Sequence, residues 1–141
     1  MNHYFFMIGI MILAGLLSSM SIWAYRWIDV RISVNDFYMI GLMTAWMVFF
    51  MSLYDQFWIA LGLSSIWIVA FYYFIRRQSF ISTRQYYRGM IPHHSMAILA
   101  SKRLLESQPT LAKEDWEFIE NIIRTQEEEI QWMKDRINNL V

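Results

Sequence analysis

The chain has 141 residues, of which 57% are apolar and 18% aromatic, and it contains 11 methionines and no cysteine. Soluble domains average about 45–50% apolar residues, so this composition argues against an ordinary cytosolic globule. The lack of cysteine excludes disulfides, Cys-ligated zinc, iron–sulfur clusters and a thiol nucleophile in these residues. Twelve basic and twelve acidic residues give zero formal net charge, so we expect no nucleic acid partner.

The charges are distributed unevenly along the chain. Residues 1–75 contain only five of the charged residues but 19 of the 25 aromatic residues. Three stretches within them carry no charge, at 4–25, 37–54 and 57–75. About 20 apolar residues cross the hydrocarbon core of a bilayer as a helix, and Trp and Tyr concentrate near the ends of such helices. The sequence therefore predicts an all-α protein whose first domain, residues 1–78, is an anchor of three transmembrane helices in a lipid bilayer.

A cleaved signal peptide is the alternative interpretation of the first stretch. No Lys or Arg precedes the apolar run, and the run is longer than the apolar core of a typical signal peptide. We therefore expect this stretch to be retained as a membrane helix.

The arginines predict an orientation for this multi-pass protein. With three spans, the N-terminus and the 55–56 turn lie on one side and carry no Lys or Arg. The 26–36 loop and the C-terminal domain share the other side, which the positive-inside rule places in the cytoplasm. The arginines on that side near the spans are Arg26, Arg31, Arg76, Arg77, Arg84 and Arg88.

The second domain, residues 79–141, has the pattern of an antiparallel helical hairpin. From about Thr83, apolar and small residues recur at intervals of three and four, which is typical of one helix face. Pro109 interrupts the pattern, and Thr110 is the expected N-cap of a second helix. Pro92 lies inside the first helix and predicts a kink or a restart there.

Two helices of this size bury one stripe each and are marginal alone. We expect a partner, either a second copy that completes a four-helix bundle or the membrane helices themselves.

Residues of the hairpin that could bind a metal are thioethers and imidazoles. Their positions at helical spacing, with the chain folded back near residue 108, place them at similar heights on two facing helices. Thioether sulfur and neutral imidazole together suit copper, especially Cu(I). The candidate ligands are Met90, His93, His94, Met133 and, further round the helix, Met96.

Two polar residues of the second helix face the same seam. Gln126 interrupts a stripe of isoleucines, where an unpaired amide would be costly, so we expect it to bond to His93 or His94 and orient that ring. Glu129 points inward from an otherwise solvated acidic run. The alternative is that the methionines fill an irregular core and the histidines only satisfy a polar seam.

Several enzyme signatures are absent from the sequence. There is no H-E-x-x-H zinc motif, no Glu-x-x-His of a di-iron bundle and no Gly-rich phosphate loop. We find no catalytic constellation and expect no enzyme.

A second methionine pattern lies in the predicted spans. Met39, Met43, Met47 and Met51 recur every four residues and form a slowly winding ridge. Passage of Cu(I) along this ridge is one hypothesis, and flexible packing against neighbouring helices is the one that we favour.

The hairpin resembles the DUF305 family, whose helical domains carry Met-x-x-His-His followed by Gln-x-x-Glu-Ile-x-x-Met. The matching segments here are 90–98 and 126–133, and the resemblance covers about residues 83–137. Three spans before one hairpin are similar to a membrane-bound subgroup of that family. The resemblance implies a ferritin-like fold, and copper contacts at Met90, His93, His94 and Met133.

The resemblance also bears on assembly and location. Longer members hold two copies of the motif in one chain, so a single copy implies a homodimer. Exported members place the domain outside the cytoplasm, whereas the arginines here favour the inside. The sequence thus leaves two functions open: a membrane-anchored copper-binding protein, or an accessory membrane protein whose hairpin mediates oligomerisation without metal.

Overall fold

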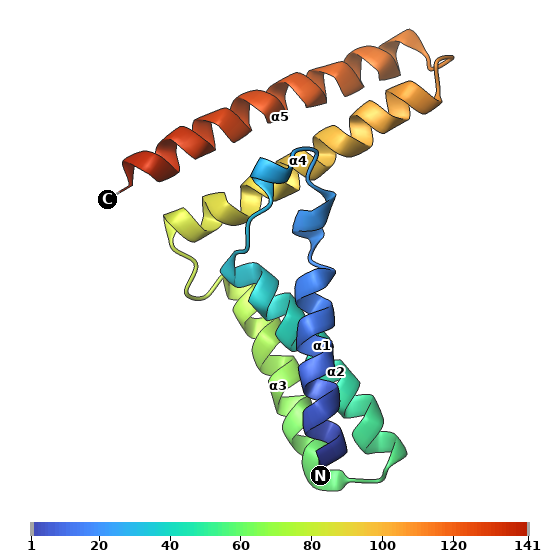
Figure 1. Cartoon of the computed structure of the whole chain (residues 1–141), viewed down its shortest axis with the longest axis vertical. Helices are drawn as coiled ribbons and strands as arrows, with labels where there is room; N and C mark the ends of the chain where they lie inside the picture. The colour runs from blue at the N-terminus through green and yellow to red at the C-terminus, as the bar shows by residue number, and fades with distance from the viewer. Residues whose placement is uncertain (1, 141) are drawn as a thin grey trace. The chain divides into compact units, whose positions relative to one another are not determined.

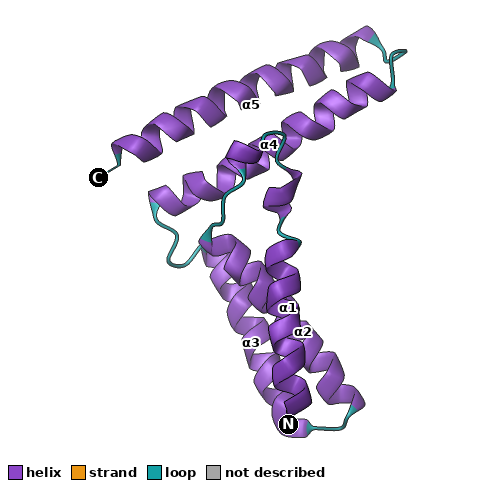
Figure 2. Ribbon diagram, viewed as in Figure 1, coloured by secondary structure: helices purple, strands orange, loops and turns teal. Residues whose placement is uncertain are grey.

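The computed structural model describes residues 2–140, and all of its regular elements in that range are helices, as Figures 1 and 2 show. The prediction of an all-α fold is confirmed. Met1 and Val141, the ends of the two predicted domains, lie outside the described residues. The helices are α1 (Asn2–Leu17), η1 (Met20–Trp23), η2 (Trp27–Asp29), α2 (Val34–Tyr54), α3 (Trp58–Arg77), α4 (Thr83–Ser107) and α5 (Lys113–Asn139).

The chain divides into two compact units that interleave in sequence. The first contains the residues up to Ser19 together with Val34–Ile81, and so holds α1, α2 and α3. The second contains Met20–Ser33 together with the residues from Ser82 onward, and so holds η1, η2, α4 and α5. The segment between α1 and α2 thus belongs to the second unit, although in sequence it falls within residues 1–78.

Within residues 2–140, three helical stretches are long and apolar enough to cross a membrane by length and composition: His3–Trp23, Val34–Tyr54 and Trp58–Arg77. The first of these is not one regular helix, since α1 ends at Leu17 and the chain continues to the 3₁₀ helix η1. The expected continuous run over 4–25 therefore ends early.

Within the first unit, α2 packs against α1 and α3. Leu42 and Ala45 of α2 form a small core with Ile68 of α3. The helices approach closely at Gly41, where an added Cβ would lie 2.4 Å from the Phe71 ring. Small residues at such points allow helices to pack tightly in a membrane, where no hydrophobic force drives them together.

Within the second unit, α4 and α5 lie side by side and run antiparallel (Figure 1). Their core is a cluster of large apolar side chains contributed by both helices. Its buried members are Ile91, Ile98, Ile130, Met133 and Ile137. The recurrence of these residues at three and four is the pattern that predicted the two helices.

The ends of α4 and α5 follow capping chemistry only in part. The Ser82 side chain caps α4 by accepting a hydrogen bond from the Gln85 N–H. The predicted N-cap Thr110 is wrong, because α5 begins at Lys113 with Ala112 at its N-cap. Residues 108–111 instead form a turn closed by the Leu111 N–H on the Gln108 carbonyl, which delays the start of the helix.

Of the two outcomes predicted at Pro92, a kink or a restart, the restart is wrong. α4 is one helix over Thr83–Ser107 with Pro92 inside it. Proline removes one backbone hydrogen bond, and its ring here is buried beside the fully buried Ile91. Packing of this helix against α5 therefore compensates for the lost bond.

Candidate functional site

The two adjacent histidines lie in different environments. His93 is exposed, whereas the His94 side chain retains only 13% of its accessible surface. Their ring centroids are 6.1 Å apart. Successive helix residues point about 100° apart, so a single helix cannot aim both rings at the same point in the core. His94 is the inward member of the pair, and His93 lies at the surface beside it.

Glu129 of α5 is the partner of His94. Its Oε2 lies 3.1 Å from His94 Nδ1, although the two atoms lack the alignment of a hydrogen bond. Burial lowers the pKa of His94, and the charges of Glu129 and His93 act in opposite directions on it. The imidazole is therefore neutral near pH 7. A carboxylate beside Nδ1 favours the proton on that nitrogen and leaves Nε2 as the free ligand atom.

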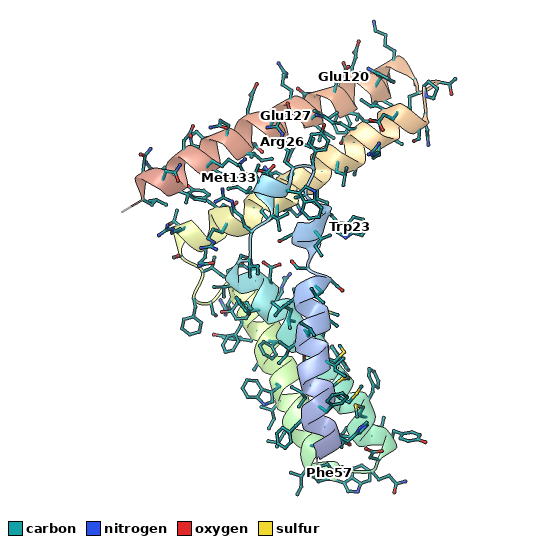
Figure 3. The ribbon with its side chains drawn as sticks, viewed as in Figure 1. Trp23, Arg26, Phe57, Glu120, Glu127 and Met133 are labelled. Atoms are coloured by element: carbon teal, nitrogen blue, oxygen red, sulfur yellow. The ribbon has the colours of Figure 1, made fainter. Side chains whose placement is uncertain are left out.

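The two methionines of the motif meet in the core between α4 and α5. Met133 of α5, labelled in Figure 3, is buried in the core cluster, and Met90 is partly buried against the same cluster. Tyr87 and Trp132 close one end of this region with an edge-to-face contact at 5.6 Å between ring centroids. Two thioethers and one fixed imidazole thus come from neighbouring stretches of the two helices.

The remaining predicted residues contribute less. Met96 is partly buried, but within residues 2–140 it is not among the side chains that pack against the core cluster. Gln126 is partly buried and forms no side-chain hydrogen bond among the described residues. The contact to His94 that we expected from Gln126 comes from Glu129, one turn further along α5.

The donor set can be compared with what a metal requires. Among the described residues, no three His, Asp or Glu side chains come together in a group that could hold a metal ion. The nearby groups are thioethers and a neutral imidazole, which fit a soft monovalent ion such as Cu(I).

A buried polar network, which the sequence did not indicate, lies next to the histidines. Asp29 of η2 is 2% exposed; its Oδ2 accepts a hydrogen bond from Ser95 Oγ at 3.0 Å, and its Oδ1 pairs with Lys134 Nζ. The Tyr25 N–H donates to Ser95 Oγ at 2.9 Å. Ser95 directly follows His94, so this network fixes the rotation of α4 at the candidate site.

A pocket of about 190 Å³ opens beside this network, and it lies entirely within the second unit. Ligand sites usually span about 300–1,000 Å³, so this pocket suits water or a small ion better than an organic substrate. Arg26 and Glu127, both labelled in Figure 3, lie on its wall. Its lining residues are Tyr25, Arg26, Asp29, Ile98, Glu127, Ile130, Gln131 and Lys134.

Lys102 of α4 contacts both α5 and Tyr25, which lies between η1 and η2. Its Nζ lies 3.0 Å from Glu127 Oε1 and 4.2 Å from the centre of the Tyr25 ring. Burial alone would lower the pKa of Lys102, but the hydrogen bond and charge of Glu127, with Tyr25, outweigh it and raise the pKa. Lys102 therefore stays charged near neutral pH and supports the position of the segment.

The methionine ridge of α2, which belongs to the first unit, is exposed at one end and partly buried at the other. Met39 and Met43 are exposed, whereas Met47 and Met51 are partly buried. The ridge therefore does not lie wholly within the packed interior of the described residues.

The comparisons with known proteins place the chain near one viral protein. It is 42% identical over 94 residues to an uncharacterized protein of Acanthamoeba polyphaga mimivirus. The alignment covers 63% of this chain and 62% of that protein, so the chain spans less than two thirds of the length of its relative. No family model matches the chain, and no solved structure matches it. The sequence similarity shows a relationship, and the functional argument depends on the site itself.

Proposed function

We propose that the protein is a membrane-anchored metal-binding protein that sequesters or hands over copper as cargo. The ligands in this proposal are Met90, His94 and Met133, with His93 and Met96 at its edge. The observation that carries it is the placement of His94 Nδ1 beside Glu129, on the same two helices that bring Met90 and Met133 together in their shared core. Glu129 orients the imidazole, and Gln126 lines the same seam.

The chemistry of these groups supports copper over other metals. A neutral imidazole can bind a metal without first losing a proton, and the lowered pKa of His94 keeps it neutral. Two thioethers favour Cu(I), because soft ligands select soft ions. The resemblance of 90–98 and 126–133 to the DUF305 motif adds an independent argument for the same residues.

The proposed anchor consists of α1, α2 and α3 as three transmembrane helices, with η1 at the membrane-surface end of the first span. Their length and composition support it, as do Trp58 and Tyr54 at the 55–56 turn. The proposal makes the protein an integral multi-pass membrane protein. The arginine pattern favours a cytoplasmic α4–α5 unit, whereas the family resemblance favours the opposite side.

Titration of the full-length protein in detergent with Cu(I) tests the metal site. The protein competes with a chromophoric Cu(I) chelator under anaerobic, reducing conditions. We expect saturable binding in the unmodified chain and its loss in His93→Ala/His94→Ala. His3→Ala is the matched control, because His3 is the third histidine of the chain and lies in α1.

A second pair of variants separates the methionines. Met90→Leu/Met133→Leu keeps apolar volume but removes the thioethers, and we expect it to weaken Cu(I) binding. Met39→Leu/Met43→Leu is the control, since both residues lie on α2.

Unchanged stoichiometry of Cu(I) binding in His93→Ala/His94→Ala would end the copper proposal.

An accessory protein without metal is the second candidate function. It is favoured by large exposed apolar side chains on α5, Phe118 and Trp132, which a second copy could cover. In this account, two α4–α5 pairs form a ferritin-like four-helix bundle in a homodimer.

Mass determination of the detergent-solubilised protein, with chemical crosslinking, tests the second candidate. It predicts a dimer that carries no metal and dissociates when Ile122 or Gln126 is changed. A monomer that binds Cu(I) contradicts it.

A further inference from the structure

The connecting segment, residues 20–33, has its polar and apolar side chains in inverted positions. Trp27 and Ile28 are 79% and 72% exposed, whereas their neighbour Asp29 is 2% exposed. Trp23 of η1 is also exposed. In water, a short surface segment normally places its acid outward and its large apolar side chains inward. The segment is therefore built for an apolar or interfacial medium on its outer side.

The inward side of the segment is specified by polar partners. Asp29 pairs with Lys134 and accepts from Ser95, and Ser21 donates to the Arg31 carbonyl at 2.6 Å. Burying a carboxylate is costly unless it is paired, so this orientation is held by specific contacts. Rotating the segment to hide Trp27 would break these contacts. The exposure of the apolar side chains is thus a consequence of a defined fold.

The covalent connections of the segment indicate which medium lies on its outer side. The segment begins within the first membrane-length stretch, His3–Trp23, and ends at Ser33 next to Val34, where the second begins, so it joins the two stretches directly. Ile28 is six residues from Val34, which limits its distance from the start of α2 to about 20 Å. Trp is the residue that bilayer interfaces favour most, and Arg26, which is exposed here, can reach lipid phosphates.

We infer that the connecting segment is a membrane-interface seat, in which Trp23, Trp27 and Ile28 insert among the lipid headgroups and upper acyl chains. This inference depends on the proposed membrane anchor. The same segment binds α4 through Ser95 and α5 through Lys134, so the seat holds the α4–α5 unit at the bilayer surface.

Site-directed spin labelling in the full-length protein tests the seat, and the lack of cysteine makes single-cysteine variants straightforward. Ile28→Cys and, separately, Trp27→Cys are labelled after reconstitution into phosphatidylcholine/phosphatidylglycerol vesicles. Collision rates are measured with oxygen, which concentrates in lipid, and with a water-soluble nickel complex. Met43→Cys on α2 serves as the lipid reference, and Lys113→Cys at the start of α5, where the side chain is 88% exposed, as the water reference.

We expect the oxygen-to-nickel ratio at positions 27 and 28 to exceed that at 113 by several fold and to approach that at 43. If position 43 reads as lipid while 27 and 28 match 113, the seat is wrong but the anchor stands. If position 43 itself reads as water, the proposed anchor fails and the seat with it. Strong spin–spin coupling at 27 or 28, with protection from both reagents, would show that a second copy covers the segment and would overturn the inference.

Discussion

The two units use apolar residues in opposite ways. In the first unit, long apolar side chains point outward along α1, α2 and α3, and the packed interior is small. In the second unit, a row of isoleucines is buried between α4 and α5, and their outer faces carry most of the charge. Apolar residues thus turn toward the surroundings in one unit and toward the interior in the other. Under the proposed membrane anchor, this difference means that each unit is folded for a different solvent.

The connecting segment combines features of the two units. It belongs to the second unit by its contacts, yet its exposed aromatic side chains resemble those of the first. Variants that affect one regime and spare the other therefore test the comparison directly.

The largest effect is expected at the buried ion pair. Lys134→Met leaves Asp29 buried without a countercharge, and breaking such a pair costs about 3–5 kcal/mol. We expect α4–α5 amides in the full-length protein to lose protection from hydrogen exchange by that amount. Lys113→Met is the matched control, because Lys113 on the same helix pairs with Glu117 at the surface, where pairs contribute about 0–1 kcal/mol. Equal losses in the two variants would contradict the structural role of the network.

Shortening one core isoleucine in each unit tests whether the first unit is folded for lipid and the second for water. Ile91→Ala removes a fully buried side chain of the second unit and should cost about 2–5 kcal/mol. Ile68→Ala in the α2–α3 core should cost less, because lipid chains are as apolar as the side chain and no hydrophobic transfer term is lost. Both values come from hydrogen exchange in detergent micelles. A loss at Ile68 as large as that at Ile91 would indicate that α2 and α3 are folded for water.

Helix contact in the first unit depends on small residues. Gly41→Ala places a methyl group 2.4 Å from the Phe71 ring, which must move, and overpacking of this kind costs about 1–3 kcal/mol. Gly62→Ala on α3 is the control, since an added Cβ there meets nothing within 4 Å. Denaturation with SDS in mixed micelles reports the α2–α3 contact. The account predicts easier denaturation for the first variant only.

The smallest effect is the pH dependence of the second unit. Burial holds the pKa of His94 below its ordinary value of 6.5, so the unfolded chain binds more protons than the folded chain as pH falls below that value. Stability is therefore full above about pH 6.5, declines as pH falls toward the folded pKa, and levels off below it. Unfolding at several pH values should show this slope in the unmodified chain. The slope should vanish in His94→Gln and persist in His93→Gln.

The sequence predicted the features that depend on local patterns. Runs without charge predicted the membrane-length helices, and spacing at three and four predicted α4 and α5 together with the level at which His94 meets Glu129. These features are set by residues close in sequence or by the simple geometry of a hairpin.

The sequence did not predict features that depend on tertiary contact. Asp29 and Ser95 are 66 positions apart, and no local pattern pairs them with Lys134. The start of α5 and the continuity of α4 through Pro92 likewise depend on turn geometry and packing rather than on residue type. At the candidate site, pattern reasoning assigned the orienting role to Gln126 because its amide interrupts a stripe of isoleucines, although Glu129 lies on the same helix face. Only the relative positions of the two helices decide between them.

Elemental analysis of copper in the full-length protein, purified without a histidine tag from cells grown with added copper, tests the central proposal most directly. Copper should copurify with the unmodified chain and with His3→Ala, and be absent from His93→Ala/His94→Ala. Equal copper in all three proteins, or none in any of them, would contradict a Met/His site on α4 and α5.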